Sequence, residues 1–576
     1  MTKLTLTPEQ EAVVGHDGSA FVSACPGAGK TRCIVERASK ALSERNDGRG
    51  IAFLSFTNAA ISELEERLIA DGLLPSPAFP HFVGTFDRFI WHFLVEPFGL
   101  AGCNEPPRLI PDTGSMTIRP FAAAQELRLD CFDRETGKII PEKARAVRFN
   151  RDPSAHETSA KRLRATLLEK GLLDFDDARR IAATNIADKD HAPRLAQVLS
   201  ARFGEIIVDE AQDCNPEDLS IIEWLRSDAG IATKVVCDPH QSIYGFRKGV
   251  SDELFKYAET FEEKERLPLT GNFRSSSHIC KAIQQLRAPS HRGDADEALG
   301  KNKDCDLPIQ IFSYAGQGVS TEIGAKFCAL AKELEIDPAT CRLAAKTRGS
   351  GLRAIGAFAE EIGGSLVQRL AHAAMQFHHT GSQKDLLAAI KEAHIVLMSI
   401  SGKLDGRTYH HALSDDQLKD LDWRGHVVKI LKALRFDHVA GQTRTEWVAN
   451  ARTLLSEFVP PDGRTIAQLL PNQVALDGIL QAAPETGISP RTIHEVKGKQ
   501  YPGMCVVLTS QTAKKIINHI INEPDDDADI AENARAFYVA ASRAEKLLVI
   551  ACPKSQAKRL ADHIALSGAK VEFTNL

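Results

Sequence analysis

The sequence predicts an α/β fold with two parallel β-sheets in one chain, each interrupted by a mainly helical insertion. Two series of short apolar runs, rich in β-branched and aromatic residues and separated by helical stretches, predict the two sheets. The first series comprises 20–24, 51–56, 81–86, 205–210 and 233–238, and the second comprises 308–314, 341–347, 505–510 and 547–552. The stretches at roughly 90–170 and 350–485 lack this strand rhythm, so we expect each to be an insertion into one sheet.

Composition sets the outer limits of the functional hypothesis. The 576 residues, of which 43% are hydrophobic and 26% charged, predict a soluble globular protein of roughly three to four domains. A net charge of −5 predicts that any path for nucleic acid is a local groove. The twelve cysteines include no CxxC pair, so we expect no disulfide framework, no metal cluster and a cytoplasmic location. We also expect no signal peptide and no membrane span.

The segment ACPGAGKT at 24–31 has the pattern of a phosphate-binding loop between a strand and a helix. Gly27 and Gly29 allow the backbone to aim N–H groups at phosphate oxygens, Lys30 would reach the outer phosphates, and Thr31 would bind Mg²⁺. A plain tight turn is the alternative for this segment taken alone. The residues predicted to bind ATP here are Ala24, Cys25, Pro26, Gly27, Ala28, Gly29, Lys30 and Thr31.

The segment IVDEAQD at 207–213 places two adjacent carboxylates at the end of a predicted strand. We expect Asp209 to hold Mg²⁺ and Glu210 to polarise the attacking water. A P-loop kinase or a small GTPase would leave the segment QSIYGFR and the second series of strands unexplained.

With these elements in order, the sequence resembles the superfamily-one DNA helicases of the UvrD/Rep/PcrA type over nearly its whole length. The segments that carry the resemblance are LTPEQ (6–10), SFTNAAISELEERL (55–68), GTFDRF (84–89), GLLDFDD (171–177), VCDPHQSIYGFR (236–247), LTGNFRSSS (269–277), RTIHEVKGKQYPG (491–503) and ARAFYVAASRAEK (534–546). The resemblance implies two RecA-like domains in tandem. It places domain 1A at 1–90 and 171–275, insertion 1B at 91–170, domain 2A at 276–350 and 486–576, and a reduced insertion 2B at 351–485.

The resemblance also implies roles around the nucleotide. Gln10 would bond the adenine edge, Phe273 would stack on the base, and Gln500 stands where the family usually places a glutamate against the ribose. Gln241, Arg274 and Arg543 would meet the γ-phosphate, the two arginines as fingers. The expected catalytic set is therefore Glu210, Lys30, Gln241, Arg274 and Arg543.

DNA contacts follow from the same segments. Aromatic stacking on bases is sequence-tolerant, as a translocating motor requires, although core packing is the alternative for Tyr244 and Phe246. The predicted DNA contacts are Thr57, Asn58, Thr85, Phe86, Tyr244, Phe246, Arg247, Thr492 and His494.

The resemblance implies an ATP- and Mg²⁺-dependent 3′-to-5′ DNA helicase or single-strand translocase acting on single-stranded and tailed double-stranded DNA. The stretch between Arg274 and Thr492 is short for this family, so we expect feeble unwinding by the isolated chain, rescued by a partner or by self-association. The alternative is a nucleic-acid-sensing ATPase subunit that controls a partner nuclease, similar to the compact helicase-like subunit of Gabija-type antiphage systems. DNA repair, replication restart and antiviral defence all stay open as pathways.

Overall fold

The chain folds into two compact units. The first comprises Met1–Pro97, Arg179–Ala357 and Pro484–Leu576, and the second comprises Phe98–Ala178 and Phe358–Ala483. The structure is a computed structural model, and it describes residues 5–44, 47–74, 78–100, 102–103, 105–110, 112–121, 124–243, 251–293, 296–316, 318–356, 365–379, 383–404, 407–416, 420–437, 440–461, 463–480, 488–522 and 527–576.

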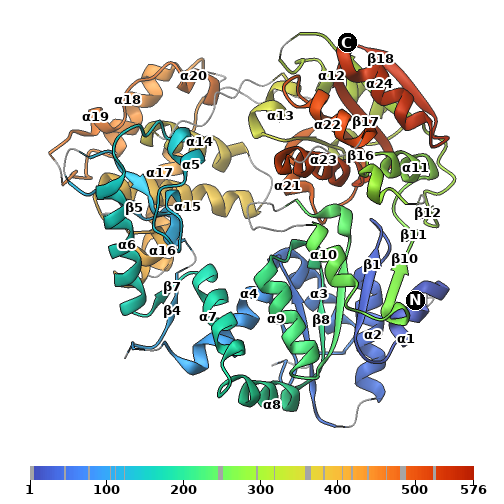
Figure 1. The fold of residues 1–576 in the computed structure, drawn as a ribbon. Coiled ribbons are helices and arrows are strands. Elements are labelled where there is room, and N and C mark those ends of the chain that lie inside the picture. Colours follow the sequence, from blue (N-terminus) through green and yellow to red (C-terminus); the bar gives the residue numbers. More distant parts are fainter. Residues whose placement is uncertain are drawn as a thin grey trace. The chain divides into compact units, whose positions relative to one another are not determined.

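The first sheet of the first unit has six strands in the order β10-β1-β9-β8-β2-β3, and every pairing is parallel. Its strands are β1 (Ala20–Ala24), β2 (Gly50–Ser55), β3 (Phe82–Thr85), β8 (Phe203–Val208), β9 (Ala232–Cys237) and β10 (Arg266–Leu269). Each of the five runs predicted for this sheet lies on one of these strands. Every residue of β2 and β8 is buried, as expected of central strands covered on both faces. Figure 1 shows α3 beside this sheet, where it packs on β2 and β3.

The second sheet has six strands in the order β15-β14-β16-β17-β13-β18, again all parallel. Its strands are β13 (Ile309–Tyr314), β14 (Arg342–Ala345), β15 (Ser489–Thr492), β16 (Tyr501–Val507), β17 (Ala544–Pro553) and β18 (Val571–Asn575). The predicted α/β class with two parallel sheets is therefore confirmed.

Three strands of the two six-stranded sheets were not predicted, and all three lie at sheet edges: β10, β15 and β18. Pro268 in β10 and Pro490 in β15 remove a ladder donor, which an edge strand tolerates. Their short sequences also lack the apolar run that identified the inner strands.

The helices of the first unit cover the two sheets. They are α1 (Pro8–Gly15), α2 (Lys30–Glu44), α3 (Asn58–Ala70), α4 (Phe86–Phe89), α8 (Ala192–Arg202), α9 (Pro216–Ser227), α10 (Ser251–Ala258), α11 (Ser277–Gln285), α12 (Ile323–Glu333), α13 (Arg348–Ala354), α21 (Ile493–Val496), α22 (Ala513–Ile521), α23 (Ala528–Ala541) and α24 (Lys554–Ala565). Helix α7 (Phe175–Ala187) runs into this unit from the second one.

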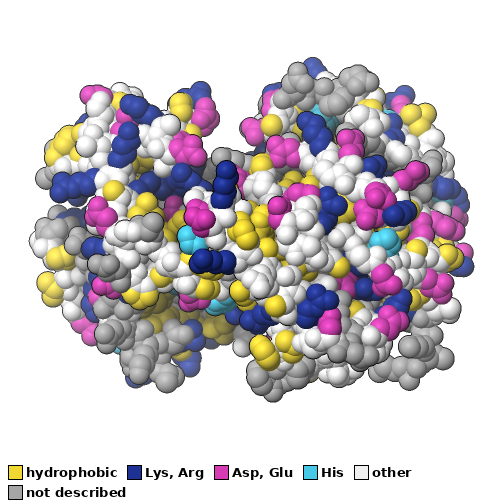
Figure 2. Space-filling model, turned by 60° about the horizontal axis from the view of Figure 1, so that its bottom comes forward, with side chains coloured by type: hydrophobic (Ala, Val, Ile, Leu, Met, Phe, Trp, Pro, Cys, Tyr) yellow, Lys and Arg dark blue, Asp and Glu magenta, His cyan; other side chains and the backbone are white. Residues whose placement is uncertain are grey.

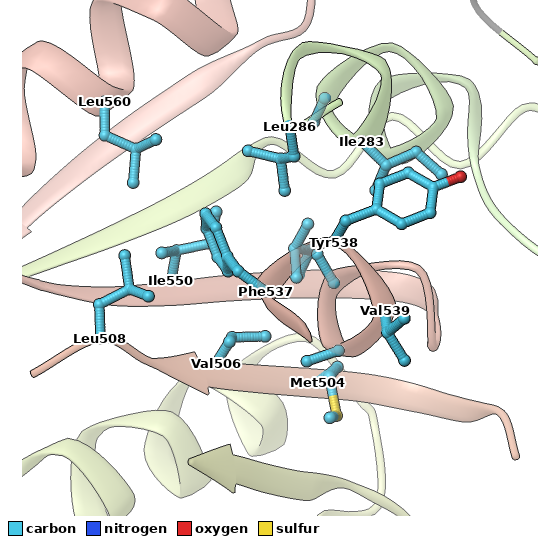
Figure 3. Packing of buried hydrophobic residues seen from close by; sticks show 14 of the residues in the cluster. Ile283, Leu286, Met504, Val506, Leu508, Phe537, Tyr538, Val539, Ile550 and Leu560 are labelled. Carbon is cyan, nitrogen blue, oxygen red and sulfur yellow. The ribbon is translucent and has the colours of Figure 1, made fainter. Parts of the chain in front are cut away.

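Helix α23 is anchored in the core of the second sheet. Phe537 and Tyr538 of α23 are each 1% exposed and lie in one buried cluster with Val506 of β16 and Ile550 of β17 (Figure 3). This packing fixes the end of α23, directly before Arg543.

The second unit contains the segments predicted as insertions. Its elements are β4 (Arg108–Leu109), β5 (Thr117–Ile118), β6 (Leu127–Arg128), β7 (Leu172–Leu173), α5 (Pro141–Ala146), α6 (Ser154–Glu169), α14 (Leu366–His379), α15 (Gln383–Ile400), α16 (Tyr409–Asp415), α17 (Asp420–Ala433), α18 (Arg444–Leu454), α19 (Ile466–Leu469) and α20 (Leu476–Ile479). The segment 91–170 is less helical than expected, because prolines such as Pro106, Pro107 and Pro120 stop helices and short strands intervene. Helices α14, α15 and α17–α20 share a buried core around Trp447. Over the described residues, no helix is long and apolar enough to cross a membrane.

Candidate active site

The segment 24–31 forms a tight turn between β1 and the first residue of α2. β1 ends at Ala24, α2 begins at Lys30, and Thr31 is its second residue. Gly27 and Gly29 have φ of +74° and +79°, the left-handed region that favours glycine. The turn, with Cys25, Pro26 and Ala28, therefore places backbone N–H groups and a helix N-terminus at the carboxyl edge of the first sheet.

Residues 272–274 pack directly against this turn. The carbonyl of Gly27 accepts a hydrogen bond from the Phe273 amide at 2.9 Å, and a Cβ at Gly27 would lie 2.7 Å from the Cβ of Arg274. Asn272 holds the segment in place, because its Oδ1 accepts from the amides of Arg274 and Ser275, each at 2.9 Å. Phe273 and Arg274 therefore lie beside the predicted phosphate loop, although they follow it by about 250 residues.

Gln10 contacts the turn from its other side. Helix α1 starts with a capping box between Thr7 and Gln10, which fixes the backbone of Gln10. The buried Gln10 amide nitrogen donates to the carbonyl of Ala28 at 3.0 Å. The structure brings Gln10 to the loop, while its contact with adenine stays a prediction.

The two carboxylates follow directly after β8. The Asp209 amide donates to the Leu54 carbonyl at 2.8 Å, and Oδ1 of Asp209 accepts from the Glu210 amide at 2.8 Å. Glu210 has φ 58° and ψ 35°, a left-handed conformation that is costly for a non-glycine residue and that clusters at functional sites. One oxygen of Glu210 lies 3.7 Å from Nζ of Lys30, and the other accepts a hydrogen bond from the Gln212 amide.

The charges around the carboxylates push their pKa values apart. Burial, followed by the adjacent Glu210 carboxylate, raises the pKa of Asp209 to about 7. Burial also opposes ionisation of Glu210, but Lys30 and then Lys497 lower the pKa of Glu210 to about 2. Glu210 is therefore ionised at neutral pH, the form in which a carboxylate can act as a base.

A continuous set of hydrogen bonds joins Glu210 to an arginine of the second sheet. Gln212 donates to Glu210 and accepts from the backbone N–H of Asp238 at 3.0 Å. Oδ2 of Asp238 accepts from the amide of Gln241 at 2.7 Å, and Oε1 of Gln241 accepts from Arg543 at 2.5 Å. Gln212 and Asp238 were not among the predicted site residues, although both lie inside the segments that identified their neighbours.

Arg274 and Arg543 lie together beside this network. Arg543 is only 2% exposed and also donates to the carbonyl of Val539 at 3.0 Å. Arg274 donates to the carbonyl of Ser542 at 2.9 Å and to Oε1 of Gln500 at 3.2 Å. Burial, followed by the charge of Arg543, lowers the pKa of Arg274 to about 9. Two guanidinium groups that repel each other in this way form a site for an anion with several charges.

A buried ion pair makes a second link between the sheets. Nζ of Lys497 lies 2.6 Å from both carboxylate oxygens of Asp213, and both side chains are buried. Asp213 ends the 3₁₀ turn that starts after Glu210, and its amide donates to the Glu210 carbonyl at 3.0 Å. This pair was not predicted, because the sequence does not say which of many Lys and Asp residues meet.

The predicted DNA contacts fall into three groups. Thr57 follows β2 and Thr85 is the last residue of β3. They cap α3 and α4, where their hydroxyls accept from the amides of Ala60 (3.2 Å) and Arg88 (3.3 Å). Asn58 is exposed in the first turn of α3. Because the carboxyl ends of parallel strands share one edge of a sheet, these residues and Asp209 lie on the same edge.

Phe86 lies in the core of the first unit, and a DNA contact at this residue stays a prediction. Its side chain is fully buried and its ring centroid lies 5.4 Å from that of Phe56, so the ring is part of the core and is not free to stack on a base. A single aromatic residue after a strand does not reveal on which side of the sheet edge its ring packs.

The remaining predicted DNA contacts lie elsewhere. Thr492 ends β15 and forms a capping box with Glu495, and the His494 ring nitrogen lies 3.3 Å from the carbonyl of Ile243. Tyr244, Phe246 and Arg247 lie outside the described residues. Figure 2 shows Lys and Arg side chains intermixed with Asp and Glu side chains on the face in view, which agrees with a net charge near zero.

Known families and proteins match this chain over its length. The UvrD/REP helicase N-terminal domain matches residues 6–262, and the UvrD-like helicase C-terminal domain matches residues 466–555. The ATP-dependent DNA helicase UvrD1 of Mycobacterium tuberculosis is 27% identical over 315 residues, which cover 49% of this chain and 39% of UvrD1. The ATP-dependent DNA helicase PcrA of Staphylococcus aureus is 21% identical over 616 residues, which cover 94% of this chain and 82% of PcrA. The match thus spans about two fifths of UvrD1 and most of PcrA.

Proposed function

Because the chain belongs to the UvrD/REP helicase family, we propose that it is an ATP-dependent DNA helicase or single-strand translocase that moves 3′ to 5′. One observation carries the proposal: hydrogen bonds run from Glu210 on the first sheet through Gln241 to Arg543 on the second. A carboxylate and an arginine that are joined by hydrogen bonds across two sheets can couple the chemical state of a bound nucleotide to the distance between those sheets. A simple phosphate-binding protein needs no such link.

The residues at the turn fit ATP with Mg²⁺. The left-handed glycines and the helix N-terminus at Lys30 form an anion cradle, and a hydroxyl at Thr31 with a carboxylate at Asp209 provides oxygen donors of the kind that Mg²⁺ prefers. Thr31 and Asp209 would hold the ion, which when bound would neutralise charge on the β- and γ-phosphates. The paired charges of Arg274 and Arg543 favour the same polyanion.

The chain's own residues divide the work of hydrolysis. Lys30 and Lys497 keep Glu210 ionised and Gln212 orients it, so Glu210 can accept a hydrogen bond from the attacking water. Lys30, 3.7 Å from Glu210, is free to turn to the phosphates when they arrive. Arg543 would stabilise charge on the γ-phosphoryl group as hydrolysis proceeds.

The helix starts at Thr57 and Thr85 support a DNA track along the same sheet edge. Backbone N–H groups at helix N-termini are good donors to phosphate and carry no sequence preference. We therefore place the backbone of single-stranded DNA along this edge, next to the carboxylates that follow β8.

ATP hydrolysis measured with no DNA, single strands and duplex tests the activity. We expect strong stimulation by single strands in the wild type and none in Lys30→Ala. Tailed duplexes of several tens of base pairs, unwound under single-turnover conditions, test polarity and processivity. A preference for 3′ tails supports the proposed direction and a preference for 5′ tails overturns it. Because the 351–485 segment is short, we expect weak unwinding by dilute monomer and rescue at concentrations that allow self-association.

A further inference from the structure

Arg179 of α7 bridges two carboxylates that come from separate segments of the first unit. Its Nε donates to Oδ1 of Asp218 at 2.7 Å, and a terminal guanidinium nitrogen donates to Asp87. The side chains of Arg179 and Asp218 are 8% and 2% exposed. A planar guanidinium buried between two carboxylates holds both at fixed positions, since its donors lie in one rigid fork.

On one side, this bridge reaches the turn after the hydrolytic carboxylate. Asp218 lies in the first turn of α9, where its Oδ2 accepts from the Asn215 amide at 3.1 Å and its own amide donates to Oδ1 of Asn215 at 2.7 Å. Asn215 is five residues after Glu210, and the 3₁₀ turn Ala211–Asp213 lies between them. Arg179 therefore helps to fix where the chain goes immediately after Glu210.

On the other side, the bridge reaches the segment proposed to meet DNA. Asp87 is two residues after Thr85, in α4, which runs directly into a π-helix at Ile90–Val95. Helix α7 contacts this stretch a second time, because the Asn185 amide donates to the carbonyl of Leu94 at 2.8 Å. A π-helical stretch holds one extra residue per turn, so it has a discrete alternative in the α-helical register, and such stretches are frequent at functional sites.

We propose that Arg179 is a positioning residue that transmits DNA binding at the 85–95 segment to the turn that follows Glu210. The inference rests on the proposed function, because it takes DNA as the ligand of that segment. If DNA binding displaces Asp87, the rigid guanidinium of Arg179 must move with it. Asp218 and the start of α9 must then shift to keep their hydrogen bond to Arg179. DNA would thereby change the rate of hydrolysis more than the affinity for ATP.

Two variants test the bridge from its centre and from its DNA side. Arg179→Lys keeps the positive charge but replaces the fork by a single ammonium, and Asp87→Asn weakens one arm while leaving Arg179 paired with Asp218. The quantities to measure are the ATPase kcat with and without single-stranded DNA and the DNA concentration that gives half-maximal stimulation. In both variants, the kcat without DNA and the ATP affinity should stay within about twofold of the wild-type values. The stimulation ratio, which is kcat with single-stranded DNA divided by kcat without DNA, should fall about three- to tenfold. The double variant should fall no further than the stronger single variant.

Arg37→Lys is the matched control, because Arg37 is also a buried arginine that hydrogen-bonds two carboxylates, those of Glu205 and Asp17. Arg37 donates to both oxygens of Glu205 at 2.9 Å, at the start of β8, far along the strand from Glu210. This control should lower the melting temperature and leave the stimulation ratio unchanged. If Arg37→Lys lowers the ratio as much as Arg179→Lys does, the effect is general destabilisation and the proposal fails.

The outcomes separate this inference from the proposed function. If single-stranded DNA stimulates the wild type, Asp87→Asn and Arg179→Lys to the same extent, the proposed role of Arg179 is wrong and the proposed function stands. A wild type that DNA does not stimulate overturns the proposed function and the bridge with it. If Arg179→Lys does not fold, Asp87→Asn decides, because Asp87 is 19% exposed and its replacement leaves the buried pair of Arg179 and Asp218 in place.

Discussion

Replacing Arg543 by alanine tests the link between the two sheets most directly. Arg543 is buried and donates to Gln241, Val539 and Ser542, so truncation leaves buried acceptors without a donor. An unsatisfied buried group costs about 1–3 kcal/mol, which we expect as a lower free energy of unfolding. The effect on catalysis should be larger, because removing an arginine that stabilises the γ-phosphoryl charge costs about 10³–10⁵ in rate. At about 1.4 kcal/mol per tenfold, this equals about 4–7 kcal/mol of transition-state stabilisation.

The assay is single-turnover ATP hydrolysis at saturating single-stranded DNA, with ATP affinity measured separately. Gln241→Ala is the companion variant, because it breaks the hydrogen-bonded link to Arg543 and leaves the arginine's charge in place. We expect Arg543→Ala to lose far more hydrolysis than ATP affinity, and Gln241→Ala to lose much less than Arg543→Ala. Loss of affinity and rate in equal proportion would make Arg543 a ground-state binder. Turnover within tenfold of wild type would refute the reasoning.

Three further predictions concern the same unit. Glu210→Gln should bind ATP and lose hydrolysis by orders of magnitude, whereas Lys30→Ala should lose both; near-normal turnover of Glu210→Gln would reject its assignment as the base. Gly27→Ala should weaken ATP binding at least tenfold, about 1.4 kcal/mol, because its Cβ would lie 2.7 Å from the Cβ of Arg274 at φ +74°; unchanged ATP affinity by titration would contradict this. Burial lowers the pKa of His563 below its ordinary value of 6.5, so the unfolded chain binds the proton more tightly. The free energy of unfolding should then fall as the pH drops below 6.5, and urea titrations of His563→Gln should show a flatter fall.

The sequence by itself determined the α/β class, the inner strands of both sheets and the phosphate-binding turn. These features are local: an apolar run of four to eight residues, or glycines at fixed spacing before Lys30 and Thr31, carries its own structural signal. The resemblance of the quoted segments also identified the family, which the domain matches confirm. The nuclease-linked sensor and the pathway stay predictions.

Only the tertiary structure decided which distant side chains meet. Arg543 bonds Gln241 across 302 positions of sequence, and Arg179 joins Asp87 to Asp218. The segment 534–546 identified Arg543 as a site residue but not its partner, and nothing local distinguishes Arg179 from other arginines in the chain. The structure likewise placed the ring of Phe86 in the core of the first unit. Pairings of this kind depend on how whole sheets and helices pack, so the free energy that selects them is spread over the fold and leaves no short motif in the sequence.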